Sequence, residues 1–489
     1  MDIVFSTFNA RYSHTALALR CLRANLGNLH DRSIIVEFDN SLAPQTAAEK
    51  LLAHDPEIVL FSVYIWNLTV TAETATILRT VRPDLKIVIG GPEVSYEYEE
   101  LALFRTANHL ICGEGEGIIE KICRDLLDGK TPSKVIEASP ADLKSIALPY
   151  DEYTDEDIAH RRIYVETSRG CPFKCEYCLS ALEATVRFFP PERIFPMFEK
   201  LIERGVRIFK FLDRSFNINA AHAAAVLRFF LENRRDGMML HLEWEPEHLP
   251  PSLEKLIAEA PPGFLQLEVG VQTFNPEVSK RIERPLDADK VEAHIRTLAA
   301  LPSVHLHADL IAGLPGETFD SIAAGFDRLH ACGPHEIQMG ILKKLRGAPI
   351  AKHDVEWQMV YNTSPPYDAL QTATLSFVEL QKIRRFARFW DITVNNGRFP
   401  HTAPLLWENQ PSVFAAFMEW SEWLYAQTHT TFGFTPVRLV QLLEQFLTEQ
   451  LDVNAKTVRN AIETDLATRS PAAKGMERQT RKSVTEKIK

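Results

Sequence analysis

Three cysteines, Cys171, Cys175 and Cys178, lie within one short segment, CPFKCEYC. The β-branched and aromatic residues before them, 162–167, predict a strand, so the cysteines are expected on a loop that leaves a strand end. Three thiolates at this spacing suit an iron–sulfur cluster or a zinc ion. Zinc usually takes four protein ligands, often as two CxxC pairs, and the sequence holds no second pair. The spacing therefore favours a 4Fe–4S cluster with one open iron, and a structural metal site is the alternative.

The CxxxCxxC spacing, with Tyr177 before the last cysteine, resembles the cluster loop of the radical S-adenosylmethionine (SAM) enzymes. The resemblance implies that the amino and carboxylate groups of SAM chelate the open iron. It also implies that an electron donor such as flavodoxin or ferredoxin reduces the cluster, which splits SAM and leaves a 5′-deoxyadenosyl radical. That radical removes an unactivated hydrogen atom, a step that the cofactors rather than a side chain supply.

Beyond the loop, strands and helices are predicted to alternate over 156–350, which indicates a partial (β/α)6 barrel. Active sites of such barrels lie at the C-terminal ends of the strands, and polar residues gather there. At the end of the second strand, the carboxylate of Asp213 could bind the amino group of SAM. Arg214 beside it could bind the carboxylate of SAM through two hydrogen bonds. For each residue an ordinary salt bridge or helix cap is the alternative. The predicted SAM-binding residues are Tyr177, Asp213, Arg214, Glu243, Glu268, Gln272 and Asp309.

Residues 1–140 alternate predicted strands and helices five times, which favours a doubly wound, flavodoxin-like parallel sheet. Ligands of such sheets bind at the carboxyl ends of the strands. There the chain places a glycine pair at 90–91 and a Gly-Glu-Gly-Glu run at 113–116. Glycines at these ends let a large flat ligand approach the backbone closely. On spacing alone, ordinary turn glycines are the simpler interpretation.

These two turns, ahead of a radical-enzyme loop, resemble the cobalamin-binding domain of many radical SAM enzymes. The sequence lacks the Asp-x-His-x-x-Gly motif whose histidine ligates cobalt in cobalamin mutases. No histidine of this domain is therefore expected beneath the cobalt. His14 is expected to be a structural residue or to support the residues that bind the ligand. The resemblance implies cobalamin bound at the strand ends, near Asn9, Ser62, Gly90, Gly91, Glu93, Gly113 and Glu114.

A cobalamin domain beside a radical barrel implies that methylcobalamin passes a methyl group to a substrate radical, and that a second SAM remethylates the cobalt. We therefore predict a cobalamin-dependent radical methyltransferase acting on an unactivated carbon or phosphorus atom. The substrate, a small molecule or a peptide, is unknown, and no catalytic side chain can be named. Three alternatives stay open: a rearrangement or cyclisation without methyl transfer, a radical enzyme without cobalamin, and a non-catalytic cluster-binding protein.

The remaining segments carry fewer signals. Residues 141–155 lack periodicity and are predicted to be a linker. Residues 351–470 are predicted to form a mostly helical C-terminal extension, because apolar residues such as Phe414, Phe417 and Trp420 recur at helical spacing. Its sequence blocks resemble the extension of an uncharacterised branch of the cobalamin radical proteins. An aromatic and amide-rich segment, 357–367, is either a pocket wall or a packed turn, and the polar residues 471–489 are predicted to be disordered.

The composition is that of a soluble globular protein of two or three domains. The formal net charge of -11 does not indicate a basic surface for nucleic acid, so no nucleic-acid partner is predicted. Seven cysteines without a disulfide pattern indicate a reducing compartment. The sequence shows neither a signal peptide nor a long apolar run, so a cytoplasmic protein without membrane spans is predicted.

Overall fold

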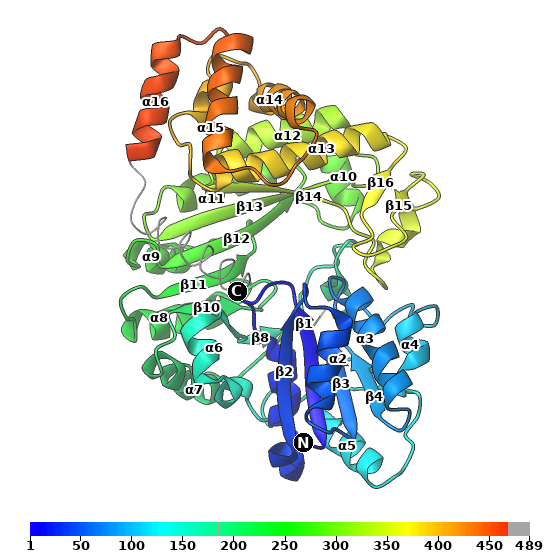
Figure 1. The fold of residues 1–489 in the computed structure, drawn as a ribbon. Coiled ribbons are helices and arrows are strands. Elements are labelled where there is room, and N and C mark those ends of the chain that lie inside the picture. The colour runs from blue at the N-terminus through cyan, green and yellow to red at the C-terminus, as the bar shows by residue number, and fades with distance from the viewer. Residues whose placement is uncertain (184, 468–489) are drawn as a thin grey trace.

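The structure is a computed structural model that describes residues 1–183 and 185–467. The described residues form two parallel sheets of six strands each and a mostly helical C-terminal region (Figure 1). This confirms the predicted fold class. The predicted tail, 471–489, lies outside the described residues. None of the described helices is long and apolar enough to cross a membrane.

The first sheet has the strand order β2-β1-β3-β4-β5-β6, and every pair is parallel. Alternate residues of its strands face two separate apolar layers, one under α2, α3 and α4 and one under α1 and α5. The sixth strand was not predicted, because its three residues are too few to show a period. The strands are β1 (Ile3–Asn9), β2 (Ser33–Asp39), β3 (Ile58–Ser62), β4 (Lys86–Gly90), β5 (His109–Cys112) and β6 (Val135–Glu137), and the helices are α1 (Leu17–Ala24), α2 (Pro44–Leu52), α3 (Leu68–Val81), α4 (Ala102–Thr106) and α5 (Ile119–Leu127).

The glycines at the strand ends of the first sheet are needed for the close packing of the protein's own backbone. Gly91 has φ +110°, and a Cβ atom there would lie 2.5 Å from the carbonyl oxygen of Val63. Gly113 has φ +87°, and a Cβ atom there would lie 2.6 Å from the carbonyl oxygen of Ala138. The space that we expected these glycines to leave for a ligand is therefore filled by neighbouring backbone.

The second sheet has the order β14-β13-β12-β11-β10-β7 and curls into an open barrel, with helices on its outer face (Figure 1). All six predicted strands are present within a few residues of their expected ends. The strands are β7 (Ile163–Val165), β10 (Ile208–Phe211), β11 (Met239–Trp244), β12 (Leu265–Gln272), β13 (Val304–Ala312) and β14 (Glu336–Ile341), and the helices are α7 (Pro191–Glu203), α8 (Ala220–Glu232), α9 (Pro251–Glu259), α10 (Pro276–Arg281), α11 (Ala288–Ala299) and α12 (Phe319–Ala331).

The inner face of this barrel is polar. Along β12 and β13, buried apolar residues that pack under the helices alternate with half-buried residues that point inward. Strand register aligns the inward residues into layers, so that Glu243, Glu268, His307 and Glu336 lie side by side. Because barrel interiors are usually filled by branched apolar side chains, a charged interior indicates a binding surface rather than a packed core.

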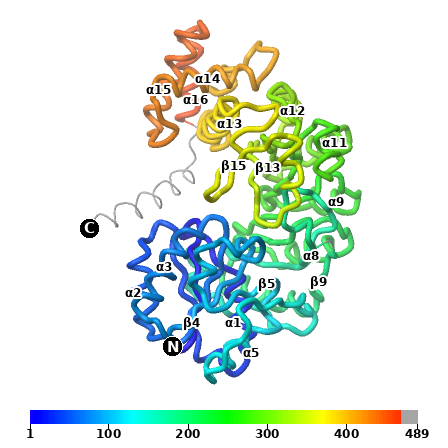
Figure 2. Tube along the Cα trace, turned by 90° about the vertical axis from the view of Figure 1, so that its right-hand side faces the viewer, coloured from blue at the N-terminus to red at the C-terminus, as the bar shows by residue number. Residues whose placement is uncertain are grey.

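The junction between the two sheets is built from the predicted linker. A short helix, α6 (Asp155–His160), begins at the last residue of this linker and is capped by Thr154. This helix was missed because its single turn is too short to show periodicity. Buried Arg20 of α1 donates to Glu37 and to Asp157 of α6, at 2.8 Å each. The carboxyl ends of the first sheet thus face the barrel (Figures 1 and 2).

The C-terminal region packs on the barrel helices (Figure 2). As predicted, Phe414, Phe417 and Trp420 are buried. The aromatic-rich segment forms a hairpin of two short strands that was not predicted. A π-helical segment (Asp391–Asn395) brings the Asn395 amide against edge strand β14, where it accepts from Ile337 N at 3.1 Å and donates to Ile337 O at 3.0 Å. The elements are β15 (Val360–Tyr361), β16 (Ala369–Gln371), α13 (Phe377–Trp390), α14 (Val413–Thr428), α15 (Pro436–Gln445) and α16 (Ala455–Ala467).

The packing of Gly91 makes a prediction with a matched control. Gly129 also has a positive φ, +77°, but nothing lies within 4 Å of a Cβ atom placed there. Gly129→Ala should cost about 1–2 kcal/mol for its backbone conformation alone. Gly91→Ala should cost a further ~1–3 kcal/mol, because Val63 must shift. Urea unfolding followed by circular dichroism would compare them, and equal losses would contradict the close packing.

Candidate functional site

The three cysteines lie together at the end of β7. The Cys178 N–H donates to the carbonyl of Cys175 at 3.0 Å, and the Cys171 N–H donates to Glu183 at 3.2 Å. Burial raises the pKa of the Cys171 thiol, and the other two thiols raise it further. Among the described residues, no three His, Cys, Asp or Glu side chains converge as they would around a single metal ion. Ligands of a cubane cluster bind separate irons at its corners, so this loop suits a cluster better than a mononuclear ion.

Two side chains that sequence reasoning missed donate to the cysteine sulfurs. The Ser215 hydroxyl lies 3.9 Å from Cys171 Sγ, and Arg284 Nη1 lies 3.7 Å from Cys175 Sγ. Arg284 also donates to the carbonyl of Gly270 at 2.8 Å and to Glu245 at 3.2 Å. Hydrogen bonds to sulfur help to set a cluster's reduction potential. The donor set therefore fits thiolates that carry a cluster.

Asp213 has a different role from the one we expected. Its carboxylate is buried and accepts from Thr167 N at 2.9 Å, Thr167 Oγ1 at 2.6 Å and Ser168 Oγ at 2.6 Å. These donors belong to the segment that leads into the cysteine loop. The carboxylate thus fixes the start of the loop instead of presenting a free oxygen to the amino group of SAM.

The middle of the loop is held from outside the barrel. The Glu176 N–H donates to Ile282 at 3.1 Å, and its carbonyl accepts from Ile350 at 2.9 Å. Its buried carboxylate contacts His353 Nε2 at 2.5 Å and forms an ion pair with Lys352. Sequence reasoning missed these contacts because their partners lie far along the chain. They fix the direction in which the loop presents its cysteines.

The end of β12 combines a glycine with a strained residue. Gln272 has φ +69°, and its Nε2 lies 2.3 Å from where a Gly270 Cβ atom would be. A non-glycine residue in this conformation stores strain, which is common at binding sites. The amide of Gln272 therefore lies over Gly270 at the barrel mouth, the position predicted for a SAM-binding side chain. Tyr177 of the cysteine loop is half-buried nearby, among residues of α10 and the C-terminal region.

The other predicted SAM residues line the inner face of the barrel. Arg214 is the partner of Glu243, at 3.4 Å, and burial raises the pKa of Glu243. Burial alone would raise the pKa of Glu268, but its hydrogen bond from His241 and the charge of Lys210 lower it to about 2. Asp309 lies 3.3 Å from His307 Nε2 without hydrogen-bond geometry, and its buried Oδ1 has no donor among the described residues. Glu243 and Asp309 thus retain free acceptor atoms for a ligand.

The polar residues predicted at the cobalamin edge bind other parts of the chain. The Asn9 amide donates to the carbonyl of His14 and to Glu37, at 3.0 Å each. The buried Ser62 accepts from Thr7 through its carbonyl, at 2.8 Å. The Glu93 carboxylate accepts from Tyr367 Oη at 2.7 Å and pairs with Arg346 at 3.2 Å. These residues position the edge and its neighbours, so any corrin contact would come from other groups.

Exposed aromatic rings occupy that edge. Tyr64 and Trp66, which follow β3, stack with ring centroids 4.5 Å apart and an interplanar angle of 4°. Trp66 is 46% exposed. Tyr12, which follows β1, is 48% exposed, but the guanidinium of Arg161 covers one face of its ring at 4.5 Å. Exposed aromatic faces at the carboxyl ends of parallel strands suit a flat, largely apolar ring such as a corrin.

The cobalamin edge and the cysteine loop meet at one buried cation. Arg169 precedes Cys171 by two residues, and its guanidinium lies 3.0 Å from Glu114, 2.8 Å from Glu116 and 2.7 Å from Glu166. Glu114 also pairs with Arg187. Glu114 was predicted to contact cobalamin, whereas the structure engages it in this junction. The charges of the second glycine turn therefore attach the first sheet to the loop.

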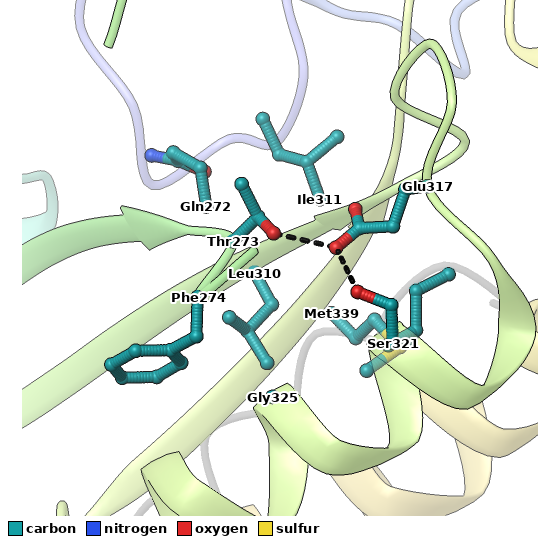
Figure 3. Close-up of a pocket in the computed structure, with 10 residues that line it drawn as sticks. Gln272, Thr273, Phe274, Leu310, Ile311, Glu317, Ser321, Gly325 and Met339 are labelled. Carbon is teal, nitrogen blue, oxygen red and sulfur yellow. Dashed lines mark hydrogen bonds between the residues drawn. The ribbon is translucent and has the colours of Figure 1, made fainter. Parts of the chain in front are cut away.

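One acidic group of the barrel has a pKa that is raised close to neutrality. Glu317 accepts from Thr273 Oγ1 at 2.5 Å and from Ser321 Oγ at 3.4 Å (Figure 3). Its Oε2 is buried without a partner, beside a pocket of ≈ 10 Å³. Burial raises the pKa of Glu317 to about 7. No cation compensates it among the described residues, so it is a structural carboxyl group that prefers its neutral form.

Three family models match the chain. Residues 4–122 match the B12 binding domain, residues 165–329 match the Radical SAM superfamily, and residues 355–489 match a protein family of unknown function (DUF4080). The first two matches cover most of the two sheets and leave out β6 of the first and β14 and the start of β7 of the second. The third begins just after the turn whose residues hold the cysteine loop.

Two distant relatives of the chain are named methyltransferases. An uncharacterized methyltransferase, PH0819, of Pyrococcus horikoshii is 23% identical over 63% of this chain and 71% of its own length. The cobalamin-dependent radical SAM methyltransferase TokK of Streptomyces tokunonensis is 22% identical over 59% of this chain and 47% of its own length. The chain thus spans about half of the second relative. The solved structure of the cobalamin-dependent S-adenosylmethionine radical enzyme OxsB shares the fold with TM-score 0.63 at 13% identity, over 99% of this chain and 81% of that one.

The donors to sulfur make the second prediction. Arg284→Met should lower the midpoint potential of the reconstituted cluster, because a hydrogen bond that stabilises the more negative reduced state is lost. Arg281→Met is the control, since Arg281 stacks on Trp357 and contacts no cysteine. Redox titration followed by electron paramagnetic resonance measures the potential. A protein with Cys171, Cys175 and Cys178 all changed to alanine serves as the blank and should hold no cluster.

The same shift of potential in both arginine variants would contradict a specific role of Arg284. Cluster iron retained by the triple-alanine protein would contradict the cysteine assignment itself.

Glu317 makes the third prediction. Its pKa in the folded protein, about 7, lies above its usual value of 4.5, so folding favours the protonated form. This stabilisation is complete below about pH 4.5 and is lost as the pH rises through about 7. Urea unfolding should show that Glu317→Gln removes up to about 3 kcal/mol of the stability difference between these pH values. The same pH dependence in both proteins would contradict the assignment.

The donor chemistry and the comparisons agree on the cofactors. Three cysteines with donors to their sulfurs suit a 4Fe–4S cluster, and aromatic rings at the edge of a parallel sheet suit a corrin. A radical SAM domain implies the cluster and SAM, and a B12 binding domain implies cobalamin. The chain thus combines an N-terminal B12 binding domain, a radical SAM domain and a C-terminal DUF4080 region.

Proposed function

We propose that the protein is a methyltransferase that transfers a methyl group by way of cobalamin to an unactivated carbon, or a phosphorus atom, of a polar substrate. One observation carries this proposal. The edge of the sheet that suits cobalamin and the loop that suits the cluster meet at Arg169, through Glu114 on one side and Glu166 on the other. Two cofactors held at one junction can act on the same substrate molecule.

When bound, the cluster and SAM supply a carbon-centred radical, and cobalamin supplies the methyl group. The chain's own residues bind and orient these groups. Ser215 and Arg284 donate to the cysteine sulfurs, and the strained Gln272 lies over Gly270 at the barrel mouth. The charged inner face of the barrel, including Asp309 with its free acceptor atoms, would bind polar groups of the substrate.

The substrate would enter at the open side of the barrel. A cavity of ≈ 290 Å³ lies at the edge strand β14, lined by His307, Glu336, Gln338 and Asp391 among others. His307 and Glu336 also belong to the inner face, so this cavity connects the barrel interior with the edge. A cavity of this size admits a small molecule or a peptide side chain.

The names of distant relatives support methyl transfer, since PH0819 and TokK are both described as methyltransferases. Cleavage of SAM at the cluster needs one electron, and we propose a flavodoxin or a ferredoxin as its donor. All cysteines in the described residues are free thiols, which supports a reducing, cytoplasmic setting.

An anaerobic turnover assay tests this function as the fourth prediction. The reconstituted protein, with SAM, hydroxocobalamin and a chemical reductant, should form both S-adenosylhomocysteine and 5′-deoxyadenosine in a bacterial metabolite extract. Methyl transfer consumes one SAM as the methyl source and cleaves another reductively, so the two products should accumulate in equal amounts. Mass spectrometry measures both, and SAM with a deuterated methyl group would label the product.

The triple-alanine cysteine protein is the control and should form neither product. Formation of 5′-deoxyadenosine without S-adenosylhomocysteine would contradict methyl transfer and indicate a rearrangement. Turnover that is identical without cobalamin would contradict its role.

A further inference from the structure

Three basic side chains surround the contact between His14 and Tyr164, where the two sheets meet. His14 follows β1 of the first sheet, and its Nδ1 lies 2.5 Å from the hydroxyl of Tyr164 on β7. Arg162, an exposed residue, directly precedes β7, and its backbone N–H donates to the carbonyl of Ser13 at 2.9 Å. Lys210 is the neighbour of Tyr164 across the sheet, on the inner face of the barrel. Arg11 completes the group from the exposed end of the β1 loop.

Two of these cations lack partners among the described residues, and the third, Lys210, has one long ion pair. The guanidinium groups of Arg11 and Arg162 form no hydrogen bond or ion pair with any described residue. Lys210 Nζ lies 3.5 Å from Glu268 Oε2, an oxygen that His241 already contacts at 2.7 Å. The ammonium group therefore has unused donors. Arg11 and Arg162 thus keep their donors free, and Lys210 keeps those that Glu268 does not use.

Other carboxylates near the junction are already paired. Glu37 accepts from Arg20 at 2.8 Å and from Arg161 at 3.1 Å. Asp157 accepts from Arg20 at 2.8 Å. These acids balance their own arginines, so they leave Arg11 and Arg162 without a carboxylate partner in the described part of the chain.

The pKa of His14 reflects these neighbouring positive charges. Burial lowers the pKa of His14, and the charges of Arg162, Lys210 and Arg11 lower it further. His14 is therefore neutral at physiological pH. When the Tyr164 hydroxyl donates to Nδ1, the opposite Nε2–H of neutral His14 is left to donate to a ligand.

We propose that Arg162, Lys210 and His14 form an anion subsite for a phosphate or carboxylate group of the substrate. Arginine and lysine are the side chains that bind such groups most effectively, and a partly desolvated junction strengthens the attraction. Arg162 and His14 come from opposite sides of the junction, so the subsite exists only in the assembled protein. The assignment rests on the proposed function, because it takes the group that faces the barrel to be the substrate.

Inorganic phosphate is the probe for this subsite. In apo full-length protein with ¹³C-labelled histidine, the His14 resonance is identified by its loss in His14→Ala. Phosphate should raise the His14 pKa saturably, because a bound anion favours the imidazolium. Lys210→Gln and Arg162→Gln should each weaken phosphate binding about tenfold. Lys290→Gln, which removes an exposed lysine of α11, should leave binding unchanged.

The phosphodiester of cobalamin is a second source of the same chemistry, and cobinamide, which lacks it, separates the two. Phosphate binding that survives saturating hydroxocobalamin supports the substrate assignment. Loss of binding with hydroxocobalamin but not with cobinamide would assign the anion to the cofactor and overturn it. Phosphate binding that is unchanged in both variants, with folding confirmed by circular dichroism, would overturn the subsite. None of these outcomes depends on turnover, so a failure of methyl transfer would be seen separately.

Discussion

The structure depends on one buried cation, the guanidinium of Arg169. It is the point at which the second glycine turn of the first sheet meets the strand that leads into the cysteine loop. Burying a charge is costly, and the cost is offset here only because Glu114, Glu116 and Glu166 all contact the same group. Removing one partner of a buried ion pair typically costs about 3–5 kcal/mol. The position of the cysteine loop relative to the first sheet thus depends on the ion pairs of this one guanidinium.

The arrangement of each sheet was accessible from local sequence alone. Strands such as Lys86–Gly90 and His109–Cys112, and helix Ala288–Ala299, occur with the predicted bounds because apolar periodicity and turn residues act over a few positions. The cysteine loop was equally readable, since its ligands lie within one segment. Short elements were missed: β6 and α6 are too brief to carry a period, and the hairpin at 360–371 is set by contacts with distant parts of the chain.

The site was predicted less well, because the role of a polar residue depends on its partners in space. Glu93, Glu114 and Asp213 were all expected to face cofactors, yet each accepts hydrogen bonds from the chain itself. Arg284 lies more than a hundred residues from the cysteine that it contacts, and no local pattern marks it. Conversely, the alternation that places Glu268 and Asp309 on the inner face follows from strand geometry, and it could be predicted.

The C-terminal region contributes to both cofactor domains. Tyr367 donates to Glu93 of the first sheet, and His353, near the start of this region, contacts Glu176 within the cysteine loop. A region that binds both sides of the junction restricts how far they can separate. The C-terminal region thus connects the first sheet with the cysteine loop.

The amide of Asn395 has a consequence for how the protein behaves at high concentration. An open barrel ends in an edge strand whose free N–H and C=O groups can recruit a strand from another molecule, which begins aggregation. Here one side chain imitates a neighbouring strand and satisfies both groups of Ile337. The Asn395 amide thus occupies the place where a further strand would pair with β14. Strand pairing with another molecule is therefore blocked at Ile337 of this open edge.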